Sequence, residues 1–300
     1  MRECILQCLG AFPQKTDLNL KVIGTEQCDS YTRYLIEYNV EKDERVQSYL
    51  LVPNGLKAKN PAILAIHQHA GNWEVGKSEV VGLTNDKMYS YGLDLVKRGY
   101  VVIAPDIICF ESRMGEGEFK KTREDQKAYE RFLFCDYLVN GKTLQGKTLN
   151  DLSVAIDVLC ALDYVDKDNI GVIGHSLGGQ ESIWLQWYDE RIKAGVSSCG
   201  VSEIKDIIAN GVLHNFYLYV PNMLMECDMD ELIYEITLKR GLLISSGLKD
   251  EEHFPLSGIE KIEERIQNVN FKSIRFDGGH QFGETEKEEA YGFLDMHLKI

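Results

Sequence analysis

The stretch "NIGVIGHSLGGQES", Asn169 to Ser182, places a serine between two glycines. The apolar run Ile170–Ile173 precedes the first glycine and helix-forming residues follow the second, which predicts a strand, a tight turn and a helix. In that context the pattern G-x-S-x-G is typical of a nucleophile elbow, which projects the serine hydroxyl above the end of a strand. We therefore predict that Ser176 is a nucleophile; the alternative is a glycine-rich turn that only reverses the chain.

Predicted strands and helices alternate on both sides of this turn. Ala62–His69 and Tyr100–Asp106 are continuous apolar runs, as expected of strands buried on both faces. Further strands are predicted at 193–200, 240–247 and 271–279, and helices at 85–99, 149–165, 178–190, 257–267 and 287–299, with Gly99 and Asn150 as cap residues. The alternation predicts an α/β fold with a mostly parallel central sheet of about eight strands, flanked by helices.

Three segments lie outside this alternation. Residues 21–53 are rich in β-branched and aromatic residues and predict antiparallel strands. Residues of about 110–146 (the first excursion) and 200–231 (the second excursion) fit no strand–helix unit, and each follows a strand at the edge where the serine would lie. Ligands of open α/β sheets bind beyond the carboxyl ends of the strands. We therefore expect both excursions to form a cap or lid near the active site of one domain, residues 1–300.

Composition argues against several classes of partner. The formal net charge of −14 disfavours nucleic acid and anionic membrane surfaces, because both are bound by basic faces. The N-terminus has no long apolar core, no run approaches the ~20 apolar residues of a membrane span, and the eight cysteines include no CxxC. We expect a cytoplasmic protein with reduced thiols and no membrane partner. A homo-oligomer is one option for its assembly.

A nucleophilic serine needs a general base, and the base needs an orienting acid, which in this kind of fold follow the serine in the order acid, then histidine. Four histidines follow the serine: His214, His253, His280 and His297. His280 lies on a glycine-containing loop between the last predicted strand and the last predicted helix, so we predict that it is the base.

The acid is expected on the loop after the predicted strand 240–247. That loop offers Asp250, Glu251 and Glu252. Asp250 comes first after the turn and is the favoured residue, with Glu251 as the second choice and Glu203 as a distant alternative. Three adjacent carboxylates would otherwise indicate a solvated loop.

The backbone N–H of Leu177 is one expected donor to the oxyanion, and a second is expected from the loop after the strand that begins at Ala62. That loop contains His67, Gln68 and His69, and we take the backbone N–H of His69 as the second donor. His67 and His69 could instead bind a metal ion, but no convincing third ligand is evident. We therefore expect no metal and no cofactor.

Six further side chains are candidates for contacts with a substrate: Gln68, Trp73, Arg113, His175, Phe216 and Tyr217. Arg113 could hold an acidic group or lie at the surface. Phe216 and Tyr217 could line an apolar pocket or pack within the second excursion. Trp73 could wall the pocket or take part in ordinary packing.

Several motifs together resemble the α/β-hydrolase superfamily, and within it the dienelactone-hydrolase-like and acetyl-xylan-esterase-like carboxylesterases. They are "VPNG", "PAILAIHQHAG", "GKSEVVGL", "DLVKRGYVVIAPD", "FESR", "IGVIGHSLGG", "SSGLKDEEHFP" and "GGHQF", spread over residues of about 46 to 282. The resemblance implies Ser176, Asp250 and His280 as a triad, with Leu177 and the "HQH" loop as the oxyanion hole. Dienelactone hydrolases proper use a cysteine nucleophile, whereas this chain has a serine.

These features predict a serine hydrolase that cleaves small carboxylic esters through an acyl-enzyme intermediate, without a cofactor. A peptidase, thioesterase or lactonase on the same fold is an alternative. So is a binding protein without catalysis, although such proteins usually lack a member of the triad and all three candidates are present here.

Overall fold

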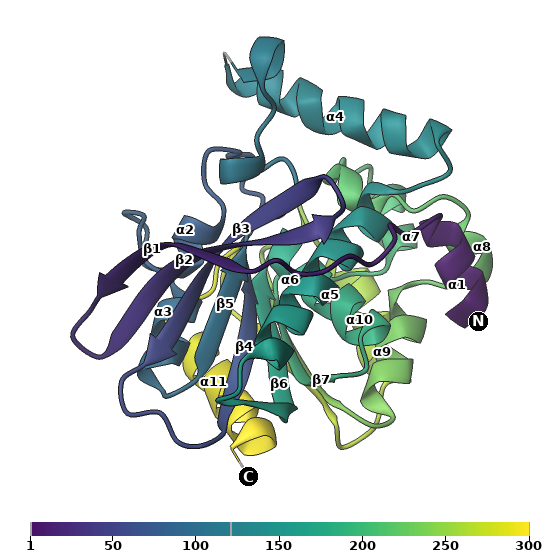
Figure 1. Ribbon diagram of the computed structural model, residues 1–300. Helices are drawn as coiled ribbons and strands as arrows, with labels where there is room; N and C mark the ends of the chain where they lie inside the picture. Colours follow the sequence, from purple (N-terminus) through teal and green to yellow (C-terminus); the bar gives the residue numbers. More distant parts are fainter. Residues whose placement is uncertain (1, 121, 300) are drawn as a thin grey trace.

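The computed structural model describes residues 2–120 and 122–299. In this part of the chain nine strands form one sheet in the order β1-β2-β3-β5-β4-β6-β7-β8-β9 (Figure 1). The strands are β1 Lys21–Gln27, β2 Tyr31–Glu41, β3 Glu44–Pro53, β4 Asn60–Ile66, β5 Val101–Pro105, β6 Val165–His175, β7 Ile192–Ser198, β8 Gly241–Gly247 and β9 Phe271–Phe276.

The sheet has an antiparallel edge and a parallel centre. The pairs β1–β2, β2–β3 and β3–β5 are antiparallel, and the remaining pairs are parallel. All residues of β5 and β8 are buried, as their unbroken apolar runs require, whereas β2 mixes buried and partly exposed positions. The predicted fold class is therefore confirmed. The described strands exceed the expected eight by one because residues 21–53 form three strands.

Helices cover both faces of the sheet. They are α1 Arg2–Leu9, α2 Lys77–Val80, α3 Tyr91–Lys97, α4 Arg123–Val139, α5 Leu144–Ala161, α6 Leu177–Tyr188, α7 Ile204–Ala209, α8 Met223–Glu226, α9 Met229–Thr237, α10 Leu256–Arg265 and α11 Glu284–Leu298, with short 3-10 helices η1 Glu111–Arg113, η2 Gly117–Lys120 and η3 Phe216–Leu218. Successive residues of β4 point to opposite faces: Leu64 joins a core with α5, α6, α9 and α10, and Ile63 joins a second core with α3 and α11.

The N-terminal cap of α5 differs from the prediction. Asn150 was expected to begin this helix, but the helix starts at Leu144 and its cap is Thr143. The Thr143 hydroxyl accepts a hydrogen bond from the N–H of Gly146 at 2.9 Å. Asn150 lies inside the helix, where its side-chain amide donates to the carbonyl of Val40 at 3.3 Å. The expectation was wrong because Thr143 and Asn150 are both of a cap-forming type, and the helix begins after the first of them. At the other predicted cap, Gly99 follows α3 with φ +91°.

The two excursions are largely helical. The first contains η1, η2, α4 and the start of α5, and the second contains α7, η3, α8 and the start of α9. Figure 1 shows α4 as a long helix at the edge of the molecule, separate from the layers that cover the sheet. Their role as a cap or lid on one domain stays a prediction.

All eight cysteines carry free thiols. Among the described residues, no helix combines the length and the apolar character needed to cross a membrane.

Candidate active site

Ser176 occupies a strained turn between β6 and α6. Its backbone has φ 55° and ψ −120°, a conformation that non-glycine residues rarely adopt, and its N–H donates to the carbonyl of Ser198 at 2.8 Å. The flanking glycines make this turn feasible. A Cβ on Gly174 would lie 2.2 Å from the Gly178 carbonyl, and a Cβ on Gly178 would lie 2.1 Å from the Ile66 carbonyl oxygen. The G-x-S-x-G pattern is therefore required by the close approach of strand and helix.

A histidine and an aspartate from two different loops meet near this turn. His280 lies between β9 and α11, Asp250 follows β8, and His280 Nδ1 is 2.7 Å from Asp250 Oδ2. Since a carboxylate only accepts hydrogen bonds, Nδ1 carries the proton and Nε2 is left as the basic nitrogen. Glu251, the second choice for the acid, is exposed and instead accepts from the N–H of Leu256 at 3.4 Å. The structure thus brings Asp250, and not Glu251, to His280.

The environment of Asp250 keeps it ionised. Its side chain is only 3% exposed. Burial by itself raises the pKa of this carboxyl, but hydrogen bonds from His253 and His280 outweigh burial and lower the pKa below its ordinary value. An anionic Asp250 can hold the His280 ring in one tautomer and can stabilise a positive charge on it.

Ser176 and His280 line the same cavity, which has a volume of about 490 Å³. Its lining combines polar and apolar residues, which come from the loop after β4, from both excursions and from the loops of the histidines: His69, Ala70, Gly71, Trp73, Arg123, Glu124, Lys127, Glu130, Val212, Leu213, His214, Asn215, Phe216, Glu252 and His253. Both excursions therefore supply walls of the space that the serine faces.

Two backbone N–H groups, those of Leu177 and His69, are the expected donors to an oxyanion. In the described part of the chain, neither the N–H of Leu177 nor that of His69 donates a hydrogen bond to a protein group. Leu177 is the first residue of α6, where the N–H has no partner within the helix and the helix dipole favours negative charge. Both N–H groups therefore remain available for a developing negative charge.

The loop of His69 is held by a residue that the sequence did not single out. His69 Nδ1 accepts from the N–H of Gly71 at 2.9 Å, and its Nε2 lies 2.9 Å from Glu130 Oε2. Trp73 Nε1 donates to the same carboxylate oxygen at 2.8 Å. Glu130 is a buried carboxylate on α4, so the first excursion fixes the loop after β4. No local pattern marks Glu130, because its partners lie far away along the chain.

Hydrogen bonds hold both rings of the His-x-His pair. His67 Nδ1 lies 2.8 Å from the carbonyl of Gln68, and its Nε2 accepts from the N–H of Ile107 at 3.0 Å. Both ring nitrogens of His69 are engaged as well. Hydrogen bonds therefore occupy all four nitrogens of the pair, which braces the loop.

The thiol of Cys199 lies beside the hydrogen-bonded pair of Asp250 and His280. Its sulfur, an Asp250 oxygen and a His280 nitrogen lie within 4.8 Å of one another. Burial, reinforced by the charge of Asp250, raises the pKa of the Cys199 thiol to about 12, so the sulfur stays protonated. Cys199 is therefore a neutral neighbour of the hydrogen-bonded pair of Asp250 and His280.

Of the six candidate substrate contacts, Trp73 and Phe216 line the cavity. Gln68 and Tyr217 are buried and do not: the Gln68 amide donates to Glu79 Oε1 at 2.9 Å, and the Tyr217 hydroxyl donates to the carbonyl of Ile108 at 2.5 Å. Their polar atoms satisfy other buried groups, as burial requires.

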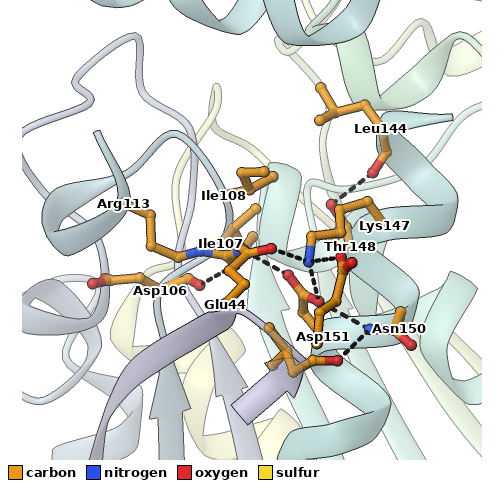
Figure 2. A network of polar contacts seen from close by, with 12 residues as sticks. Glu44, Asp106, Ile107, Ile108, Arg113, Leu144, Lys147, Thr148, Asn150 and Asp151 are labelled. Atoms are coloured by element: carbon orange, nitrogen blue, oxygen red, sulfur yellow. Dashed lines mark hydrogen bonds and ion pairs between the residues drawn. The ribbon is translucent and has the colours of Figure 1, made fainter. Parts of the chain in front are cut away.

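Arg113 lies away from the cavity, in a network of buried charges. Its guanidinium is 6% exposed and donates to Glu44 and, at 2.7 Å, to Asp151. Lys147 on α5 pairs with the same two carboxylates. Figure 2 shows the guanidinium and the Lys147 ammonium converging on them. Arg113 is thus not a surface residue and is not among the residues that line the cavity; its charge neutralises carboxylates that burial would otherwise penalise.

His175, the remaining candidate, packs against the base. It is fully buried, its Nδ1 lies 3.0 Å from the Ser198 hydroxyl, and its ring centroid is 4.7 Å from that of His280. Burial lowers the pKa of His175 well below its ordinary value, so the ring is neutral. It supports the position of His280 and does not line the cavity.

Comparisons with known proteins identify a family and a fold. The sequence model of the dienelactone hydrolase family matches residues 46–293. A Bacillus subtilis (strain 168) protein named "Putative hydrolase YtaP" is 27% identical over 308 residues, covering 99% of this chain and 98% of that protein.

Solved structures that share the fold include two esterases. One is described as a "putative acetyl xylan esterase" and comes from Bacteroides fragilis NCTC 9343. It has a TM-score of 0.72 and 18% identity, over 92% of this chain and 73% of that chain. The other is acetyl xylan esterase 1 from Thermoanaerobacterium sp. JW/SL YS485, with a TM-score of 0.64 and 17% identity, over 98% of both chains.

Proposed function

Because the chain belongs to the dienelactone hydrolase family, we propose that it hydrolyses carboxylic esters with Ser176 as nucleophile, His280 as general base and Asp250 as orienting acid. One observation carries this proposal: the base is hydrogen-bonded to a buried carboxylate at 2.7 Å and lines the same cavity as a serine on a strained elbow. Nucleophile, base and orienting group are the three parts that serine-based acyl transfer requires.

The reaction has two steps. Ser176 Oγ attacks the ester carbonyl carbon while His280 Nε2 takes the hydroxyl proton, and the carbonyl oxygen becomes an anion that the N–H groups of Leu177 and His69 stabilise. The C–O bond of the ester breaks, and the leaving alcohol takes the proton from His280. A water molecule then attacks the acyl-enzyme, with His280 again as base, and releases the acid and free Ser176. Each proton that His280 accepts is passed on within the same step, so the reaction balances without a cofactor.

The cavity favours a polar substrate with a short acyl group. Arg123, Glu124, Lys127 and Glu252 offer charged and hydrogen-bonding groups, with Trp73 as an aromatic wall. Such a lining suits hydroxyl groups better than a long alkyl chain, since unpaired buried polar groups are costly. Acetylated carbohydrates, the substrates in the names of the two structural neighbours, fit this chemistry. A panel of acetylated oligosaccharides and p-nitrophenyl esters of two to twelve carbons tests this: a preference for long acyl chains would contradict it.

The activity itself is tested with Ser176→Ala. We expect the wild-type chain to hydrolyse p-nitrophenyl acetate and to react with a fluorophosphonate probe at Ser176, and the variant to do neither. Hydrolysis that survives the substitution would overturn the proposed nucleophile. A wild-type chain that is folded but neither labelled nor active would indicate a binding protein. Matched amide and thioester substrates separate ester hydrolysis from the related reactions.

A further inference from the structure

A second histidine shares the carboxylate of Asp250. His253 Nδ1 lies 2.9 Å from Asp250 Oδ1, while His280 Nδ1 lies 2.7 Å from Oδ2. The two imidazole rings are stacked, with centroids 4.3 Å apart and planes inclined by 22°. Each oxygen of the buried carboxylate therefore has its own imidazole donor, and the base has a ring of the same kind packed against it.

The neutral form of His253 suits this arrangement. Because Asp250 is anionic, His253 donates to it from Nδ1, and in the neutral ring Nε2 then carries no proton. The hydrogen bond satisfies an oxygen that would otherwise be a buried acceptor without a donor, and it fixes the plane of the carboxylate. The orientation of Oδ2 toward His280 follows from that plane, and the stacked ring restricts rotation of the His280 side chain.

We propose that His253 is a positioning residue of the triad and a pH-sensitive one: neutral, it aligns Asp250 and His280 for catalysis, and protonated, it opposes the positive charge that His280 must acquire. This inference rests on the proposed function. The hydroxyl proton of Ser176 moves to His280 in the first step, so an imidazolium forms at that ring. A second imidazolium stacked against it repels that charge and also takes a share of the negative charge of Asp250.

His253 is placed to titrate because half of its side chain is exposed to the cavity. The titratable groups that face it are Asp250 and Glu252 on its own loop, His280 on the loop after β9, His214 on the second excursion and His175 at the end of β6. The hydrogen bond to Asp250 raises the pKa of His253 above its ordinary value despite partial burial, and the charge of Glu252 acts in the same direction.

The other two histidines stay neutral in weak acid. Burial lowers the pKa of His214 to about 3 and that of His175 well below its ordinary value. The protonation that the proposal invokes therefore falls on His253, the half-exposed ring stacked on the base. Because the base must be unprotonated to accept the Ser176 proton and His253 must be neutral to align it, log(kcat/KM) is expected to fall toward a limiting slope of 2 in acid, or about 100-fold per pH unit.

Two substitutions separate the parts of the proposal. His253→Asn keeps an amide donor at the position of Nδ1 but cannot titrate, whereas His253→Phe keeps a stacked ring and loses the donor. We expect the acidic limb of kcat/KM to have a limiting slope near 2 in the wild type and near 1 in both variants. At pH 8.5 we expect His253→Phe to lower kcat about 10-fold with little change in KM, because misalignment of the base acts on the transition state. His253→Asn should lower kcat less, because it keeps the donor to Asp250.

His297→Asn is the matched control, because it makes the same chemical change on α11, outside the residues that line the cavity. We expect it to keep the slope of 2, and thermal melting checks that every variant is folded. A slope that stays near 2 in folded His253→Asn overturns the inference, and so does a wild-type slope of 1. Neither result affects the proposed function, which fails separately if Ser176→Ala retains activity.

Discussion

His69 Nε2 lies 2.9 Å from Glu130 Oε2, so the loop after β4 is hydrogen-bonded to a helix residue 61 positions further along the chain. Trp73 donates to the same oxygen. The carboxylate of Glu130 thus links the proposed oxyanion loop to α4. It holds both Trp73, which forms a wall of the cavity, and His69, whose N–H is one of the proposed oxyanion donors.

Glu130→Ala is expected to lower kcat about 10-fold, because His69 and Trp73 lose their acceptor and the N–H of His69 is no longer held toward the carbonyl oxygen. Glu130→Gln keeps an acceptor oxygen and should lose less. Steady-state kinetics on p-nitrophenyl acetate measures both, and Asp136→Ala, an exposed carboxylate on the same helix, is the control. Wild-type kcat in folded Glu130→Ala would show that the contact does not position the donor.

The fold was predictable because its signals are local. Apolar runs such as that of β4 and the glycines around Ser176 have the same meaning wherever the chain folds, and parallel strands bring their carboxyl ends to one edge. Asp250 and His280 follow two neighbouring strands at that edge. Their meeting could therefore be expected from topology alone.

The residues that the sequence misplaced depend on distant partners. Arg113 can be buried because the carboxylates of Glu44 and Asp151 pair with it, and the sequence around position 113 does not indicate these partners. The same holds for Glu130. His253 differs, since it lies three residues after Asp250 on one turn, and that spacing was a signal that could have been used.

Asp250→Asn should lower kcat about 10³- to 10⁴-fold with little change in KM. The amide can donate to His280 Nδ1, which stabilises the tautomer that carries its proton on Nε2 and cannot act as base. Glu251→Gln is the matched control, because that side chain is exposed and does not meet His280, and it should keep wild-type kcat. The reverse pattern, with the loss in Glu251→Gln, would assign the acid to Glu251.

Arg113→Ala is expected to destabilise the protein by about 1–3 kcal/mol while the KM of the folded enzyme stays the same, because Glu44 and Asp151 lose one of their two cations and keep Lys147. Urea unfolding measures the free energy of unfolding. Arg131→Ala on the exposed side of α4 should change it by less than about 0.5 kcal/mol. A raised KM at wild-type stability would instead indicate that Arg113 contacts the substrate.

Ionisation of Glu181 makes the folded protein less stable as pH rises, whereas ionisation of Asp250 makes it more stable. Its fully buried carboxyl on α6 is bonded to Gln145 at 2.6 Å and Gln180 at 3.1 Å, and burial raises its pKa to about 8. Since the folded state binds this proton more tightly than the unfolded state, the stability it confers is present below the unfolded pKa and is lost as pH rises through about 8.

Glu181→Gln keeps a neutral side chain of the same shape and should remove this dependence. Between pH 5 and pH 9 the wild type is expected to lose about 3–5 kcal/mol more in free energy of unfolding than the variant. Urea titrations of both proteins across that range give the difference, and Glu190→Gln, whose carboxyl is exposed, should follow the wild type. Parallel curves for wild type and Glu181→Gln would mean that Glu181 is already ionised in the folded protein, and its bonds to the two glutamines would then be those of a buried anion.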